Sequence, residues 1–168
     1  MKETKTIRKV FLVYDFEKEE AWLNEMAENG WVLCRVGFCS YTFEACEPGE
    51  YTVRMEQRGH DEAYQAFLEE IGAEYIGRMA AWIYFRQKSS LGAFDLFSDI
   101  DSRIAHLQRI SRVLTAVGAL NLIIALISAL GSVPSGFLNV LCATLLMYCL
   151  GRIHGKIEAL QKERLLHE

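Results

Sequence analysis

The chain has 168 residues with a formal net charge of −4, and 51% of the residues are hydrophobic. This length suffices for one domain of ordinary size and a small appendage, so several large domains are excluded. The acidic balance disfavours nucleic acid as a partner, because phosphate groups are repelled.

A strand and a helix are predicted first. The run TIRKVFLVY, residues 6–14, is rich in β-branched and aromatic residues, which is typical of a strand. In the following EKEEAWLNEMAENG, apolar residues recur at helical spacing, Asp15 can cap the helix, and Gly30 can end it in a left-handed conformation. We expect Trp22 to anchor this helix on a sheet and Trp31 to pack over its last turn.

Four further elements complete the predicted domain. Residues 31–44 and 51–58 alternate as strands around a turn, EPGE, which predicts a hairpin. A second helix is predicted over residues 61–72, with an aspartate as its cap and a glycine at its end, and a long last strand over 74–88. The order β-α-β-β-α-β predicts an α+β domain of ferredoxin-like fold, in which one four-stranded antiparallel sheet carries both helices on one face.

Aromatic and apolar residues occur on both faces of the predicted strands. An open apolar sheet face usually marks a surface for a partner or ligand. Alternate residues of a strand point to opposite faces of the sheet, and the sequence does not determine which set faces the helices. Whether Trp82 lies on the open face or in the core therefore stays open. The residues expected to form the open face are Tyr41, Phe43, Tyr51, Trp82 and Tyr84.

A membrane hairpin is predicted next, because residues 113–151 contain no Asp, Glu, Lys, Arg or His. The stretch is too long for one span, which needs about 20 residues, but suffices for two with a turn at GSVPSG, residues 131–136. The lipid bilayer is therefore an expected partner. By the positive-inside rule both ends lie in the cytoplasm. The cations that flank the hairpin are Arg103, Arg109, Arg112, Arg152, Lys156, Lys162 and Arg164.

These observations divide the chain into four parts. They are a cytosolic ferredoxin-like domain (1–97), a juxtamembrane stalk helix (98–112), a transmembrane hairpin (113–151) and a cytosolic tail (152–168). Residues 1–97 carry 11 Lys and Arg against 17 Asp and Glu, a net charge of −6. The stalk helix, with Ser98 as its predicted cap, can continue unbroken into the first span, so that movement of the domain would reach the hairpin.

Four residues of the hairpin are candidates for contacts between helices. Asn121 and Asn139 are the amides of the two arms and are interpreted as interhelical hydrogen-bonding groups rather than as a conduction site. Ala125 and Ala129 are four residues apart and suit close packing within the hairpin or between copies.

No catalytic motif or metal-ligand spacing is recognisable, so we expect neither enzymatic activity nor a cofactor or metal. The four histidines are scattered along the chain. Glu17, Glu19 and Glu20 are interpreted as acidic residues that favour the positive end of a helix. RNA recognition is disfavoured, because residues 50–58 lack the pattern of an RNA-binding strand.

Four segments resemble a bacterial family of unknown function whose members carry C-terminal membrane helices. They are EKEEAWLNEMAENGW (17–31), YTF (41–43), EYTVR (50–54) and FSDIDSRI (97–104). Similar proteins are commonly encoded beside PadR-like transcriptional regulators. The resemblance implies a sensing or regulatory role at the membrane and assigns no residue.

We therefore expect a non-enzymatic, membrane-anchored cytosolic module that senses or regulates through its open sheet face. Its protein partner is either a second copy or a membrane complex. The alternative is an accessory subunit of a membrane transport or assembly complex, in which the hairpin packs on other membrane helices.

Overall fold

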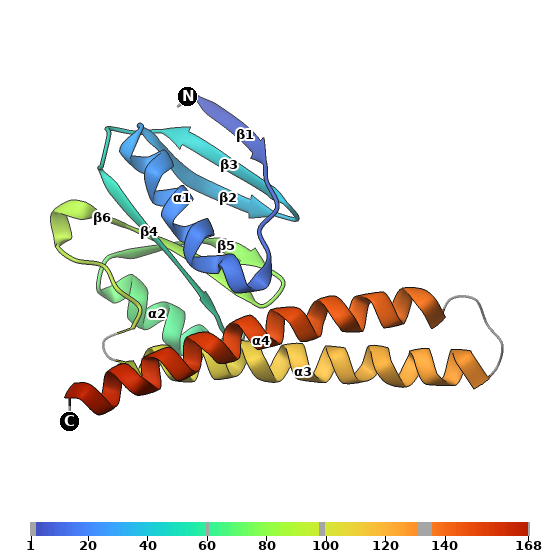
Figure 1. The fold of residues 1–168 in the computed structure, drawn as a ribbon. Coiled ribbons are helices and arrows are strands. Elements are labelled where there is room, and N and C mark those ends of the chain that lie inside the picture. Colours follow the sequence, from blue (N-terminus) through green and yellow to red (C-terminus); the bar gives the residue numbers. More distant parts are fainter. Residues whose placement is uncertain (1–2, 60, 98–99, 131–135, 168) are drawn as a thin grey trace. The chain divides into compact units, whose positions relative to one another are not determined.

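The structure is a computed structural model that describes residues 3–59, 61–97, 100–130 and 136–167. The chain divides into two units, Met1–Leu96 and Phe97–Glu168 (Figure 1). The first unit contains all the strands described, and the second consists of two long helices. Each unit is described by itself.

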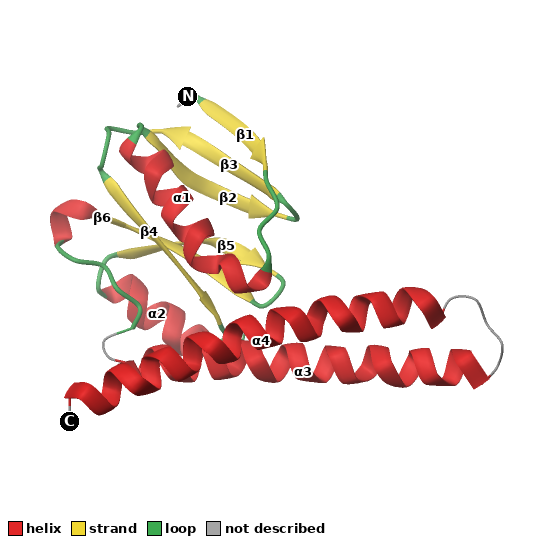
Figure 2. Cartoon of the chain, viewed as in Figure 1, coloured by secondary structure: helices red, strands yellow, loops and turns green. Residues whose placement is uncertain are grey.

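The N-terminal unit contains two three-stranded antiparallel sheets (Figure 2). In the first sheet, strand β3 (Ser40–Ala45) lies between β1 (Thr4–Arg8) and β2 (Trp31–Gly37). In the second, β6 (Trp82–Lys88) lies between β4 (Tyr51–Gln57) and β5 (Ala73–Met79). Helix α1 is Phe16–Glu28 and helix α2 is Glu62–Glu70.

The predicted single four-stranded sheet is wrong, because two of the predicted strands are hairpins. Residues 31–44 turn back at Phe38 and Cys39, and residues 74–88 turn back at Ala80 and Ala81. At these turns Cys39 has φ 49° and Ala80 has φ 53°, the left-handed region that usually calls for Gly or Asn. Neither turn has that signal. The α+β class holds, but the ferredoxin-like arrangement does not.

Strand pairing differs from the prediction accordingly. The segments 31–44 and 51–58 were expected to pair with each other. Instead β4 pairs with β6, so the turn at Glu47–Glu50, closed by a 3.0 Å backbone hydrogen bond, leads from one sheet to the other. The first strand is also shorter than residues 6–14. It ends at Arg8, and a short 3₁₀ turn at Val13–Asp15 precedes α1.

Most helix signals of the N-terminal unit are confirmed. Gly30 and Gly72 follow α1 and α2 with φ values of 81° and 88°, as left-handed stops require. Asp61 caps α2 by accepting a hydrogen bond from the Tyr64 backbone N–H at 3.0 Å. Asp15 makes no such side-chain cap; its carboxylate instead lies 2.7 Å from the ammonium group of Lys18.

Helix α2 covers part of the second sheet. Its Leu68 is buried in an apolar cluster with residues of β5, β6 and the chain that follows β6. The other buried members of this cluster are Ala73, Ile83, Phe85 and Phe94. The helix buries little else: Leu68 is its only buried residue among the nine. Phe67 and Ile71, which lie one residue before and three residues after Leu68, are about half exposed.

The second unit consists of α3 (Ile100–Leu130) and α4 (Gly136–His167), which pack together. The stalk and the first predicted span form one continuous helix, as expected. The predicted tail is not separate from the second span either, because α4 runs through it. The predicted turn residues 131–135 and the predicted cap Ser98 lie outside the described residues.

Small residues are the buried residues of α3 and α4 in the described part between residues 115 and 150. Gly118 and Ala125 are buried seven residues apart on α3, and Gly136 and Ala143 repeat that spacing on α4. A seven-residue spacing keeps these positions on the seam between two packed helices. A Cβ added at Gly118 would lie 3.8 Å from the Cβ of Leu146, so the backbones approach closely.

Candidate functional sites

The five residues predicted to form an open sheet face are buried in the structure. Tyr41, Phe43, Tyr51, Trp82 and Tyr84 are all at most 8% exposed. Their burial follows from the split of the predicted sheet in two, since side chains of both sheets converge on α1. The expected surface is therefore not exposed, and these aromatic residues form part of the interior.

Trp22 on α1 holds the helix on the first sheet. Its ring centroid lies 5.2 Å from that of Tyr41 and 5.5 Å from that of Phe43, both at steep angles. Phe11, which precedes the helix, covers the same indole at 5.6 Å. The anchoring predicted for Trp22 is thus confirmed. The second tryptophan, Trp31, begins β2, and the ammonium group of Lys5 lies 3.9 Å above its ring.

Glu19 joins the two sheets through a buried carboxylate. Its Oε1 accepts hydrogen bonds from the Tyr41 hydroxyl of β3 at 2.8 Å and from the Tyr84 hydroxyl of β6 at 2.7 Å. Burial raises the pKa of Glu19, and the two tyrosine hydrogen bonds oppose that rise. Burial, together with the charge of Glu19, also raises the pKa values of both tyrosines. Because Glu19 is only 6% exposed, we interpret its role as structural: it connects the two sheets.

Helix α1 also covers the open edge of β4. The Asn24 side chain donates to the Val53 carbonyl at 3.0 Å and accepts from the Val53 N–H at 2.8 Å, as a neighbouring strand would. Glu20 accepts from the Met55 N–H at 3.0 Å. These bonds occupy edge groups that could otherwise pair with another chain. The sequence did not predict that Asn24 and Glu20 bond β4, because a hydrogen bond from a helix residue to a distant strand has no local sequence signal.

Arg86 on β6 makes a second link between the sheets. Its guanidinium group donates to Glu44 of β3 at 2.9 Å and to Glu74 of β5 at 2.7 Å. A weaker bond reaches the Leu33 carbonyl of β2 at 3.3 Å. Arg86 is thereby committed to structure rather than available for a ligand.

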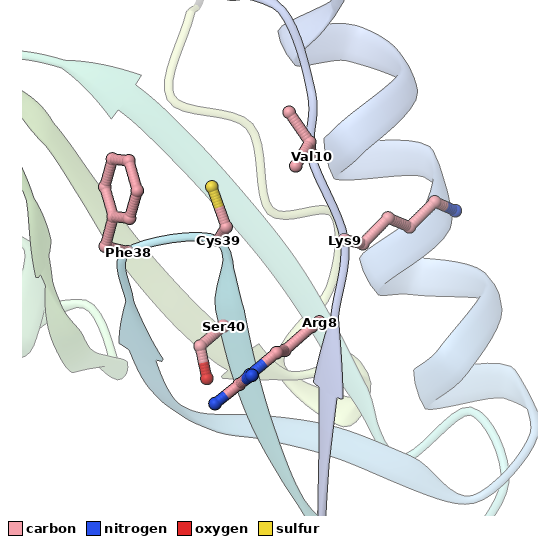
Figure 3. Close-up of a pocket in the computed structure, with 6 residues that line it drawn as sticks. All are labelled: Arg8, Lys9, Val10, Phe38, Cys39 and Ser40. Carbon is pink, nitrogen blue, oxygen red and sulfur yellow. The ribbon is translucent and has the colours of Figure 1, made fainter.

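The most exposed large apolar side chains described in this unit lie at the turn between β2 and β3, beside the end of β1. We call this surface the hairpin-tip patch; it borders a shallow pocket of about 500 Å³ and consists of Arg8, Lys9, Val10, Phe38, Cys39 and Ser40 (Figure 3). Phe38 is 87% exposed and Val10 71%. A backbone hydrogen bond of 3.2 Å from the Lys9 N–H to the Cys39 carbonyl ties the turn to the chain beyond β1.

Positive charge accompanies these apolar side chains. Arg8 forms no ion pair with the residues that the structure describes. Lys9 extends toward α1 (Figure 3), where its ammonium group lies 4.3 Å above the Trp22 ring. The patch therefore combines exposed apolar groups with two cations in a unit of negative net charge, and its residues escaped sequence analysis because the turn itself was missed.

The four residues predicted as hairpin contacts lie at different places. Ala125 is buried between the helices, whereas the Ala129 side chain is exposed. Asn121 donates to the Val117 carbonyl of its own helix at 2.9 Å. Asn139 is half-buried on α4. The buried small residues of α3 in this stretch are therefore Gly118 and Ala125, whereas Ala129 has only its backbone N near α4, 3.8 Å from a Cβ added at Gly136.

Each long helix contains an apolar stretch whose side chains are mostly not buried. The two helices are long and apolar enough to cross a membrane, with mean hydropathy values of 2.4 and 1.6 over their most apolar windows, and only 17% of each window is buried. Across the described residues, no group of three or more His, Cys, Asp or Glu side chains is arranged to hold a metal ion.

Comparison with known proteins identifies a family and no close relative. The sequence model of a family described as "Protein of unknown function (DUF2812)" matches residues 15–119, which is more than half of the chain. The match includes α1 with its Trp22 and Asn24 and extends into α3. No curated protein and no solved structure matches the chain.

Proposed function

This chain belongs to the DUF2812 family of proteins of unknown function, and we propose that it is a membrane-anchored interaction module without enzymatic activity. Helices α3 and α4 form the anchor. The N-terminal unit is the cytoplasmic part, which contacts a protein partner and thereby senses or regulates. The proposal replaces the buried aromatic face with the hairpin-tip patch as the contact surface.

The outward apolar surface of α3 and α4 carries this proposal. The core helix of a soluble protein is mostly buried, whereas more than four fifths of each apolar window here is not. Helices that are apolar all round need either a protein core or lipid around them. A bilayer would cover the exposed side chains, which include Leu120, Ile123, Ile127, Leu138, Leu141 and Leu145.

The distribution of charge supports a cytoplasmic N-terminal unit. Arg103, Arg109 and Arg112 precede the uncharged stretch, and four further cations follow it within α4. Under the positive-inside rule this places both helix ends that carry cations in the cytoplasm. The turn between the helices would lie on the opposite side.

The hairpin-tip patch supplies the partner surface. An aromatic side chain at a turn, 87% exposed, is unfavourable in water and gains free energy when a partner covers it. Arg8 and Lys9 favour a partner segment whose apolar residues are accompanied by carboxylates. We therefore expect an acidic, partly apolar protein segment at this patch.

Membrane anchoring is tested by fractionation and by topology. The full chain should stay in the membrane pellet after alkaline carbonate extraction. A reporter at either terminus should be active only in the cytoplasm, and a reporter between Leu130 and Gly136 only on the other side. Release of the chain into the soluble fraction would overturn the proposed anchor.

The partner surface is tested by site-specific photocrosslinking in native membranes. A photoreactive residue in place of Phe38 should link one recurring protein, which is then identified by mass spectrometry. The control position is Leu91, which is 61% exposed but lies outside the patch. Charge reversal by Arg8→Glu with Lys9→Glu should reduce the yield from position 38. Equal yields from both positions, or no effect of charge reversal, would contradict the assignment.

An accessory subunit of a membrane transport or assembly complex is the second candidate. The observation in its favour is a pair of glycines on α4, Gly151 and Gly155, that are exposed and have nothing within 4 Å of an added Cβ. Glycines four residues apart allow another helix to approach closely. Crosslinking from Cys142 or Cys149 into a larger membrane protein would favour this candidate, whereas an isolated homo-oligomer would count against it.

A further inference from the structure

A recess lies between α3 and α4 at the level where the charged part of each helix begins. Its volume is about 490 Å³, and both helices line it. Helix α3 contributes Gln108, Ser111 and Arg112, and α4 contributes His154 and Ile157. The recess belongs to the helical unit alone and has no part in the hairpin-tip patch.

The polar groups of the recess can all donate hydrogen bonds, and one of them, Arg112, is a permanent cation. Ser111 Oγ and His154 Nε2 lie 3.2 Å apart, which joins the two helices at this level. Arg112 is exposed and forms no ion pair with the described part of the chain. An arginine without a carboxylate partner suits an anion, which its guanidinium group can bind through two parallel hydrogen bonds.

The surrounding charge is mostly positive. Arg109, Arg152 and Lys156 lie on the adjoining turns of the two helices, and Glu158 follows the lining residue Ile157. The nearest described ion pair of this unit, between Arg164 and Asp101 at 2.9 Å, lies further from the apolar stretch. A recess among several cations and a single acidic neighbour favours a negatively charged occupant.

The position along the helices indicates which anion this is. Arg112 is the last charged residue before the uncharged stretch, and Arg152 is the first after it. The Ser111 to His154 contact shows that the two boundaries lie at the same level in this antiparallel pair. In a bilayer that level is occupied by lipid phosphates, next to the hydrocarbon region.

We propose that the recess binds the phosphate group of an anionic membrane lipid. Arg112 pairs with the phosphate, Gln108, Ser111 and His154 supply hydrogen bonds, and Ile157 contacts the apolar part of the lipid. The proposal rests on the membrane placement given above and adds to it a specific lipid site. Such a site makes the anchor sensitive to the lipid composition of the cytoplasmic leaflet.

Native mass spectrometry of the full chain, with defined lipids added to the detergent micelle, tests the site. Phosphatidylglycerol should remain bound more strongly than phosphatidylcholine. Arg112→Gln should lower the retention of phosphatidylglycerol about fivefold, as expected for one basic residue at an anionic membrane surface. The matched control, Arg103→Gln, removes the same charge from an exposed position of α3 outside the recess and should leave retention unchanged.

A second variant separates the lining residues from charge alone. Ser111→Ala with His154→Ala should also lower retention of phosphatidylglycerol, although it removes no permanent charge. Equal retention of the two lipids, or equal effects of Arg112→Gln and Arg103→Gln, would overturn the site. Displacement of phosphatidylglycerol by excess inorganic phosphate would overturn the lipid as the source of the phosphate group.

The result is distinguishable from a failure of the proposed anchor. If the chain resists carbonate extraction but shows no lipid preference, the lipid site alone is refuted. If carbonate extraction releases the chain from the membrane, the proposed anchor itself is refuted. Far-ultraviolet circular dichroism of each variant in the same detergent confirms that both helices are retained.

Discussion

The two units of this protein place their large apolar side chains in opposite ways. In the N-terminal unit, aromatic residues such as Phe43 and Tyr84 are fully buried, and most charged residues lie at the surface, with Glu19 and Glu56 as buried exceptions. In the described part of the helical unit between residues 115 and 150, the buried residues are glycine and alanine, while residues such as Ile127 and Phe137 face outward. The difference is the one that the proposed anchor implies: folding in water drives apolar groups inward, whereas packing in lipid would leave close backbone contact as the main attraction.

Polar groups follow the same contrast. In the N-terminal unit, Glu19 and Asn24 bond residues far away in the sequence and thereby connect the two sheets and close the edge of β4. In the helical unit, Thr115, Asn121 and Thr144 bond the backbone of their own helix, four residues earlier. Bonds within one helix satisfy these three side chains without a partner outside the helix, which suits the interior of a bilayer.

The largest effect is expected from Trp22→Ala, which removes the aromatic anchor of α1. Loss of the contacts with Tyr41 and Phe43 should lower the free energy of unfolding of the N-terminal unit by about 3–5 kcal/mol. Tryptophan fluorescence during urea denaturation of the full chain in detergent measures this, because Trp31 and Trp82 remain in the same unit. Trp22→Phe should lose much less, and equal losses would contradict aromatic anchoring.

Asn24→Ala should destabilise the N-terminal unit by about 2 kcal/mol, since it leaves the Val53 N–H without its side-chain acceptor and the Val53 carbonyl with the Arg54 guanidinium group as its remaining side-chain donor. Asn24→Asp keeps an acceptor for the Val53 N–H but loses the donor, so its effect should be intermediate. The control is Asn29→Ala, which removes an amide that bonds only the Glu25 carbonyl of the same helix. The same fluorescence assay applies, and similar losses at positions 24 and 29 would argue against edge closure.

Gly118→Leu should destabilise the helical pair by about 1–3 kcal/mol, because a large side chain has no room beside Leu146 and Met147. Titration with sodium dodecyl sulfate separates the two helices, and the rate of proteolysis of the hairpin at each detergent concentration measures how much of the packing is lost. Val117→Leu adds apolar volume on the outer surface of the same helix and should be neutral. A destabilising Val117→Leu with a neutral Gly118→Leu would reverse the assignment of inner and outer faces.

Glu19→Gln should change how stability depends on pH. Because burial raises the pKa of Glu19 in the folded chain, the folded state holds its proton more tightly than the unfolded state, whose value is 4.5. Stability from this group is therefore complete below pH 4.5 and is lost as pH rises through the folded pKa. The variant lacks this loss, so its stability relative to wild type should improve with rising pH. A constant difference between the two from pH 4 upward would contradict the raised pKa.

The smallest effect on stability is expected from Phe38→Ser, because that side chain is 87% exposed. The free energy of unfolding should change by less than about 0.5 kcal/mol. Association with the partner at the hairpin-tip patch should nevertheless be lost, as measured by binding of the crosslinked partner once it is purified. A large loss of stability would mean that Phe38 is part of the fold and not of a contact surface.

Prediction from the sequence succeeded for helices and failed for strand pairing. The ends of α1 and α2 were marked by Gly30 and Gly72, and the start of α2 by the aspartate at position 61, because all of these act within a few residues. The turns at Cys39 and Ala80 have no such marker. Once they were missed, two hairpins became two long strands, and the aromatic residues were assigned to an open face.

The sequence by itself determined the elements that depend on neighbouring residues: the two short helices, the continuous apolar stretch at 113–151 and the cations on either side of it. Only the tertiary structure decided which strands pair, which aromatic residues are buried, and that Glu19 and Asn24 connect α1 to both sheets. The physical reason is that burial and edge closure depend on residues far apart in the chain. Whether a tyrosine such as Tyr84 lies in the core or on the surface is decided by what packs against it, and the residues next to it in the sequence do not indicate this.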